Sequence, residues 1–152
     1  MRIGVISDTH GLLRSEALQA LSGCAHILHA GDVGDDAILD ALRKIAPLTA
    51  IRGNVDHDGL CGALPPTETI EFAGKLFYLL HAREDLDLHP HAAGIAAVIF
   101  GHSHQPEISW TNGVLYFNPG SAGPRRFTLP ITVGILECKD GNLLPSLQPL
   151  PI

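Results

Sequence analysis

Short apolar runs alternate with amphipathic segments over the first third of the chain. The runs have the length and composition of buried strands, and the segments between them carry apolar residues at helical spacing. Strands are predicted at residues 2–7, 25–30 and 48–52, and helices at 13–21 and between Asp35 and Pro47. Strand, helix, strand, helix, strand in this order predicts right-handed crossovers and a parallel sheet.

The rest of the chain changes to hairpin patterns. Three apolar stretches each have a turn pair near the middle, at Ala73-Gly74, Asn112-Gly113 and Asp140-Gly141. A residue followed by glycine at such a position favours a tight hairpin. The hairpins are predicted at 69–82, 107–117 and 130–144, with a weak helical or loop segment at 83–94 and one more buried strand at 96–100. This order predicts an α/β (α+β) fold, with one mixed sheet or two packed sheets and helices outside.

The composition is typical of one globular domain, predicted to span residues 1–152. The chain is 45% hydrophobic and 17% charged, which is enough for one sizeable core. No apolar run approaches the ~20 residues of a membrane helix, and the acid at Asp8 is unlike a secretory signal. Cys24, Cys61 and Cys138 form no Cys-x-x-Cys pair, so we expect a cytoplasmic protein with reduced thiols and no thiolate zinc site.

The net charge of the chain further limits the classes of partner that it is expected to bind. The formal net charge of −6 argues against a basic groove for duplex nucleic acid and against an anionic membrane surface. A nucleotide remains open as a substrate. The unusual feature is the count of nine histidines in so short a chain.

Polar residues that bind metals follow five predicted strands in succession. In chain order these are Asp8 and His10; Asp32; Asn54 and Asp56; His81; His102 and His104. In open α/β sheets the ligand site lies beyond the carboxyl ends of the strands, so the five sets are expected to converge. Gly31, Gly53 and Gly101 each precede such a residue, where the absence of a Cβ lets backbone approach closely.

Each of these residues has an ordinary explanation when taken alone. Two histidines in His-x-His are more often part of an exposed loop than metal ligands, an aspartate can cap a helix, and an asparagine can form a turn. Five coincidences at five strand ends explain the pattern poorly, so we predict a metal site. The donors are imidazole, carboxylate and amide without sulfur, which suits manganese, iron, zinc, cobalt or nickel rather than calcium.

Four of the histidines, with Asp8, Asp32 and Asn54, make seven candidate ligands. These are too many for one ion that also holds water and substrate, and they would serve two ions. Two divalent ions with two carboxylates leave a positive site that favours an anion. A metal pair of this kind clamps phosphorus for attack by a bridging hydroxide.

The motifs Asp8-Thr9-His10, Gly31-Asp32, Gly53-Asn54, His81 and Gly101-His102-Ser103-His104 resemble, in order and spacing, the calcineurin-like metallophosphoesterases. The run from Asn118 to Ser121, followed by Pro124-Arg125, is similar to the small bacterial and archaeal phosphodiesterase branch often called the YfcE type. The resemblance covers about residues 1–137. It implies a four-layer αββα sandwich of two mixed sheets flanked by helices.

The resemblance also implies a role for each ligand. Asp8, His10 and His104 would hold a first metal, Asn54, His81 and His102 a second, and Asp32 would bridge them. Manganese is the expected metal, with iron, zinc, nickel and cobalt as alternatives. Asp32, Asn54 and His102 are the expected catalytic residues, and Asn54 and Arg125 the expected contacts to a small phosphoester substrate. Asn118 is expected to orient a ligand such as the Asp8 carboxylate.

The sequence departs from its relatives at two positions. Many relatives carry glycine where this chain has Ala82. The larger protein phosphatases carry a histidine, a proposed general acid, where this chain has Val55, which cannot donate a proton. His57 lies nearby and is interpreted as an exposed turn residue.

The predicted function is hydrolysis of small phosphodiesters. The alternatives are a non-catalytic scaffold of the same fold, which should have lost ligand residues, and a metal-dependent nuclease or phosphomonoesterase. The acidic net charge argues against a nuclease acting on long nucleic acid. The sequence does not indicate the physiological substrate or the oligomeric state.

Overall fold

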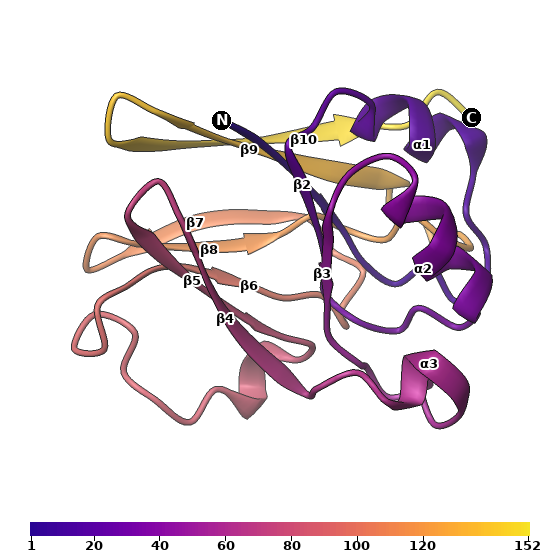
Figure 1. The fold of residues 1–152 in the computed structure, drawn as a ribbon, viewed down its shortest axis with the longest axis horizontal. Coiled ribbons are helices and arrows are strands. Elements are labelled where there is room, and N and C mark those ends of the chain that lie inside the picture. Colours follow the sequence, from indigo (N-terminus) through magenta and orange to yellow (C-terminus); the bar gives the residue numbers. More distant parts are fainter.

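Two five-stranded mixed sheets pack face to face in the computed structural model, which describes residues 1–152 (Figure 1). The first sheet has the order β10-β9-β1-β2-β3 and contains β1 (Arg2–Ile6), β2 (His26–His29), β3 (Leu48–Ala50), β9 (Thr132–Lys139) and β10 (Asn142–Pro149). The second has the order β4-β5-β6-β8-β7 and contains β4 (Thr67–Phe72), β5 (Lys75–Leu80), β6 (Ile95–Ile99), β7 (Glu107–Thr111) and β8 (Val114–Asn118). The two-sheet form of the predicted fold is therefore the one observed.

Strand direction within each sheet follows from the connections. β1, β2 and β3 are parallel, because helices connect them, and β5, β6 and β8 are parallel in the second sheet. The three predicted hairpins pair β4 with β5, β7 with β8, and β9 with β10. At each turn a residue with positive φ precedes a glycine with positive φ, the backbone that a two-residue hairpin requires.

One strand extends further than its pattern predicts. β10 continues to Pro149 and includes Pro145 opposite Leu136. A proline lacks the N–H that a central strand needs, but β10 is the edge strand of its sheet and tolerates it.

Two helices cover the outer face of the first sheet. α1 (Ser15–Leu21) and α2 (Asp36–Arg43) confirm the two predicted helices, and the Asp35 carboxylate begins α2 by accepting a hydrogen bond from the Ala37 N–H at 2.9 Å. Their buried faces pack on residues of β1 and β2, including Ile6 and Ile27. A short α3 (Gly59–Gly62) follows β3. None of the helices is both long enough and apolar enough to cross a membrane.

The main core lies between the sheets. Ile3 and Leu28 of the first sheet share a buried apolar cluster with Phe77, Ile99 and Phe117 of the second. The outer face of the second sheet is covered by Leu86 and Leu88 from the segment that begins with the 3₁₀ turn η1 (Arg83–Asp85). The four-layer arrangement is thus confirmed, with a loop as most of its fourth layer.

The loops after β1, β2, β3, β5 and β6 meet at one end of the sandwich, called the rim below. The Asp8 N–H donates to the Gly31 carbonyl at 3.0 Å, and the Gly101 N–H donates to the His81 carbonyl at 2.9 Å. The first bond joins the loops after β1 and β2, and the second joins the loops after β5 and β6. The rim is therefore a continuous hydrogen-bonded surface.

A close approach between β9 and the Phe117 ring of β8 generates a prediction for stability. A Cβ at Gly134 in β9 would lie 2.5 Å from Cζ of Phe117 and 3.2 Å from Cβ of Pro119. We expect Gly134→Ala to lower the free energy of unfolding by about 1–3 kcal/mol through overpacking. Adding Phe117→Leu should make the double variant more stable than the sum of the two single changes predicts. Urea unfolding measures both, and strict additivity would show that the ring is not what excludes the methyl group.

Candidate metal centre

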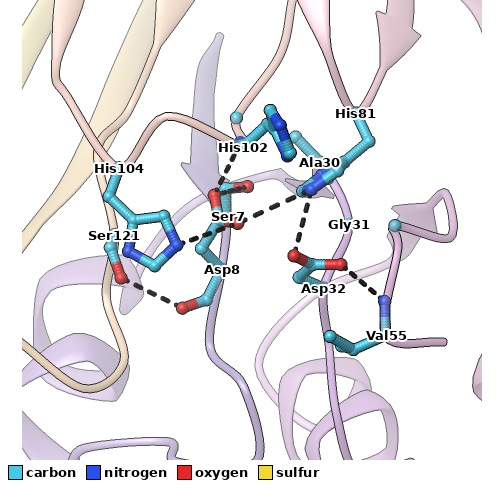
Figure 2. A network of polar contacts seen from close by, with 12 residues as sticks. Ser7, Asp8, Ala30, Gly31, Asp32, Val55, His81, His102, His104 and Ser121 are labelled. Atoms are coloured by element: carbon cyan, nitrogen blue, oxygen red, sulfur yellow. Dashed lines mark hydrogen bonds and ion pairs between the residues drawn. The ribbon is translucent and has the colours of Figure 1, made fainter. Parts of the chain in front are cut away.

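Five side chains from four loops converge at the rim: Asp8, His10, Asp32, His81 and His104. The Nε2 atoms of the three histidines lie 3.7, 3.7 and 3.5 Å from Oδ1 of Asp8. Nε2 of His10 and of His81 also lie 3.4 and 3.1 Å from Oδ2 of Asp32. Figure 2 shows Asp8 between His104 and His81, with Asp32 below His81. Two carboxylate oxygens thus face three imidazole nitrogens across one space.

In each aspartate, one carboxylate oxygen accepts hydrogen bonds from the chain and the other faces the imidazoles. Oδ2 of Asp8 accepts from the Ser7 hydroxyl at 2.8 Å and from the His102 N–H at 3.1 Å. Oδ1 of Asp32 accepts from the Val55 N–H at 3.0 Å. These bonds fix the carboxylate orientation, so that the remaining oxygens point at the imidazoles (Figure 2).

The tautomer of His81 follows from its second contact. Its Nδ1 lies 2.7 Å from the carbonyl oxygen of Ala30, which can only accept, so Nδ1 must carry a proton. Nε2 is then free to bind a cation on the side of the two aspartates. Burial by itself lowers the pKa of His81, but the Asp32 and Asp8 carboxylates raise it above its ordinary value. The site therefore attracts positive charge.

Both aspartates are ionised. Burial alone would raise the pKa of Asp32, but His81 and the Val55 N–H lower it to about 2. Burial likewise opposes ionisation of Asp8, and contacts with His10 and His81 lower its pKa below the ordinary value. A neutral pH thus leaves two negative charges in a largely buried space.

Several polar atoms at the centre are buried without a hydrogen-bond partner. They are Oδ1 of Asp8, Nε2 of His10, Nε2 of His81 and Nδ1 of His104. Such atoms are costly in a folded protein unless another group satisfies them. Two triads bring ligand atoms within 4.8 Å of one another, Asp8 with His10 and His104, and Asp8 with Asp32 and His81. The residues present therefore fit cations.

The backbone at these positions is strained. Asp8, His10, Asp32, His102 and His104 all have positive φ, between 46° and 72°. Aspartate and histidine tolerate this region better than most residues, yet five such positions in one site are unusual. Strain of this kind persists where the surrounding structure fixes it, and it is concentrated at functional sites.

Close backbone approach explains the three predicted glycines. A Cβ at Gly53 would lie 2.2 Å from Oδ1 of Asp32, and one at Gly101 would lie 2.1 Å from the Ser7 hydroxyl and 2.6 Å from Oδ2 of Asp8. At Gly31 it would meet Nδ1 of His81 at 2.6 Å. Each glycine thus leaves room for a ligand side chain or for the group that orients it, as the sequence predicts.

The remaining two predicted ligands lie on the exposed side of the centre. Nε2 of His102 is 3.6 Å from Oε1 of Glu84, and its ring centroid is 5.2 Å from that of His81. Asn54 is exposed and shares a hollow of about 270 Å³ with His81 and Arg52. Neither side chain is among the five that converge. Glu84 follows no apolar strand directly, which is why the sequence pattern does not single it out.

Asn118 supports a different element from the one expected. Its amide donates to the Gly101 carbonyl at 3.1 Å and to the Ser103 hydroxyl at 3.2 Å, and it does not bond Asp8. It therefore shapes the loop that carries His102 and His104. The Asp8 carboxylate is oriented by Ser7 instead, a residue that the sequence pattern includes only as the end of a strand.

His29 and Asp56 are structural. Nδ1 of His29 accepts from the Gly31 N–H at 3.1 Å, so Nε2–H donates to the Thr9 hydroxyl at 3.1 Å. The Asp56 carboxylate accepts from the N–H groups of Val33, Gly34 and Gly53, which ties the loop after β2 to the loop after β3. The rim is rigid because of these buried polar contacts.

Neither Arg125 nor His57 makes a hydrogen bond or ion pair with the converging ligands. The Arg125 guanidinium donates to the Leu129 carbonyl at 3.0 Å, within its own loop. His57 is exposed and lines an acidic hollow with Asp35, Asp36 and Asp58. That hollow contains none of the predicted metal ligands.

Comparison with known proteins identifies the class. The chain matches the model of the calcineurin-like phosphoesterase superfamily domain over residues 1–141 and belongs to that family. It is 36% identical over 134 residues to a probable metallophosphoesterase of Methanocaldococcus jannaschii, covering 80% of this chain and 68% of that protein. The family implies divalent metal ions, in agreement with the donors at the rim.

Solved structures are similar in fold. A novel archaeal phosphodiesterase aligns with a TM-score of 0.81 at 22% identity, covering 97% of this chain and 100% of that one. Vps29 of Chaetomium thermophilum aligns with a TM-score of 0.78 at 19% identity, covering 99% and 100%. The predicted family and fold are confirmed.

The glycine contacts predict how metal affinity responds to a single methyl group. Gly101→Ala should displace Ser7 or Asp8 and weaken metal binding by at least about tenfold, the effect of losing an orienting contact. Gly74→Ala is the matched control, because its Cβ meets nothing within 4 Å and only its φ of +77° is strained. Titration of stripped protein with Mn²⁺ measures both, and equal affinities in the two variants would contradict the role of Gly101.

The burial of His29 predicts a pH dependence of stability. Desolvation lowers its pKa from 6.5 to about 4, so the unfolded chain takes up the proton first as pH falls. The neutral, buried His29 therefore makes its full contribution to the free energy of unfolding above pH 6.5. As the pH falls toward 4, about 3 kcal/mol of that free energy is lost. In chelator, His29→Gln should lose less stability than wild type between pH 7 and 4. Parallel pH profiles by urea unfolding would contradict this account.

Proposed function

We propose that this protein is a metal-dependent phosphodiesterase that hydrolyses small phosphodiesters with two divalent transition-metal ions. The single observation that carries the proposal is the arrangement of Asp8 and Asp32, in which each carboxylate is held by one oxygen and its other oxygen faces imidazole nitrogens. Oδ1 of Asp8 and the Nε2 atoms of His10 and His81 have no hydrogen-bond partner. The phosphoesterase family of the chain supplies the chemical class.

The two triads suggest how the ions are divided. Asp8, His10 and His104 would hold one ion, and His81 with Asp32 would hold the other. Asn54 and His102 would complete the second site from its exposed side. Asp32 would bridge the ions, since its free oxygen lies near histidines from both groups. Manganese is the proposed metal, as the resemblance implies, and nitrogen and oxygen donors without sulfur are compatible with it.

The bound ions would stabilise phosphoryl charge and supply a nucleophile from water at neutral pH. The chain itself binds and orients. Asn54, which lines a hollow with His81, would donate its amide N–H to a phosphoryl oxygen. Val55 contributes its backbone N–H to Asp32 and offers no acidic proton, so the leaving group depends on its own stability.

The proposed substrate is a small molecule rather than duplex nucleic acid or a membrane lipid. The net charge of −6 disfavours long polyanions, while the cations would attract a compact one. A diester fits better than a monoester, because its single charge resists hydroxide attack less. A scaffold role is the second candidate, since Vps29 structures share the fold.

Metal content and hydrolysis test the proposal together. Stripped wild type loaded with Mn²⁺ should bind about two ions per chain and hydrolyse bis(p-nitrophenyl) phosphate. Asp32→Ala should lose the second ion and lower kcat/KM by at least about 100-fold, because it removes the bridge. Asp40→Asn, on the exposed face of α2, is the control and should behave as wild type.

Two results would contradict the proposal in different ways. Saturation at one ion per chain in wild type would overturn the dinuclear assignment. Two bound ions with no hydrolysis of any phosphodiester or monoester, under each of Mn²⁺, Fe²⁺, Zn²⁺, Co²⁺ and Ni²⁺, would favour the scaffold.

A further inference from the structure

The loop of residues 123–130 is anchored directly on the metal centre. Its first residue, Gly123, has no space for a side chain, because a Cβ there would lie 2.3 Å from the Thr9 carbonyl oxygen and 2.6 Å from that of Asp8. Just before it, the Ser121 hydroxyl donates to the Asp8 carbonyl at 3.0 Å, as Figure 2 shows. The loop therefore starts in contact with the backbone of two residues at the rim.

Internal bonds give the loop a defined shape. A bridge between Ser121 and Ile131 closes its base, and the Leu129 N–H donates to the Arg126 carbonyl at 3.0 Å. Arg125 is used within the loop, because its guanidinium donates to the Leu129 carbonyl. The loop is thus a closed, self-supported projection.

Arg126 is the basic side chain that the loop leaves available. Its guanidinium makes no hydrogen bond or ion pair, unlike that of Arg125. Arg126 follows Gly123 by three residues, and Gly123 packs on the Thr9 and Asp8 carbonyls, so the loop holds this guanidinium near the rim. A guanidinium in this place is suited to a phosphoryl oxygen.

Phe127 follows Arg126 and is the most exposed large apolar side chain of the protein. It is 89% exposed, and its φ of 52° is one that a bulky aromatic residue rarely adopts. Neither burial nor backbone preference explains a phenylalanine here, since glycine would fit this φ without strain. An exposed aromatic ring on a hydrogen-bonded loop is a stacking surface for another aromatic ring.

We propose that the 123–130 loop is a substrate-binding arm, in which Arg126 binds a phosphoryl oxygen and Phe127 stacks on an aromatic group attached to that phosphate. The substrate class is then an aryl or nucleoside phosphodiester. This inference rests on the proposed function, since the phosphate would sit at the metal centre. It assigns recognition to Arg126 and Phe127, and leaves Arg125 the task of shaping the loop.

Equilibrium binding of three phosphate monoesters tests the arm without requiring turnover. Methyl phosphate, phenyl phosphate and adenosine monophosphate are titrated into Mn²⁺-loaded protein by calorimetry. Wild type should bind phenyl phosphate and adenosine monophosphate about five- to tenfold more tightly than methyl phosphate. Phe127→Ala should abolish that preference and leave the Kd of methyl phosphate unchanged, whereas Phe127→Tyr should retain the preference.

Matched variants separate the two roles. Arg126→Gln should weaken binding of all three ligands by a similar factor, about fivefold, without changing the preference. Trp110→Ala removes another exposed aromatic ring, on the edge strand β7, and should change nothing. A preference for adenosine monophosphate alone would identify a nucleobase, and one for both aromatic ligands a general aryl site.

Equal binding of the three ligands by wild type would overturn the proposal that the 123–130 loop is a substrate-binding arm. A preference for aromatic ligands that survives Phe127→Ala would overturn it as well. Hydrolysis of bis(p-nitrophenyl) phosphate by the same wild-type sample reports on the proposed function separately. Hydrolysis without aromatic preference refutes only the arm, and aromatic preference without any hydrolysis refutes only the enzyme.

Discussion

The structure of the whole rim depends on two buried carboxylates that face three imidazoles. Asp8 and Asp32 are ionised, and each has one oxygen fixed by N–H or O–H donors from the chain. Burying two like charges side by side costs free energy unless cations compensate them. The same carboxylates raise the pKa of His81, as expected for an imidazole beside two negative charges. Divalent ions would meet the same requirement more completely.

The fold brings the charged side chains together through the course of its backbone rather than through side-chain packing. Parallel strands bring the ends of β1 and β2, and of β5 and β6, to one end of the sandwich. Glycines such as Gly53 and Gly101 then let the loops touch the ligands. The left-handed backbone at Asp8 and Asp32 is the local cost of this arrangement, and the buried contacts of Asp56 and His29 hold it in place.

The open side of the centre carries elements that lie outside the core between the sheets. Glu84 lies beside His102, and Arg52 lines a hollow with Asn54. The 123–130 loop begins near the backbone carbonyl of Asp8, which accepts a hydrogen bond from Ser121. These elements are polar, exposed or both, so they change without disturbing the core between the sheets. The same fold is shared by an archaeal phosphodiesterase and by Vps29, which agrees with function residing in such surfaces rather than in the sandwich.

The elements and the ligand types could be predicted from the amino-acid sequence, because they depend on short-range patterns. Apolar runs mark the strands, residue-glycine pairs such as Asn112-Gly113 mark the turns, and aspartate or histidine after a strand marks the rim. Which atoms meet depends on the tertiary structure. Ser7 rather than Asn118 orients Asp8, Glu84 faces His102, and Arg125 bonds within its own loop while Arg126 stays free. These arrangements depend on contacts between distant segments or on loop conformation. Sequence spacing carries no information about such contacts, because they arise from the packing of two sheets and the path of the loops between them.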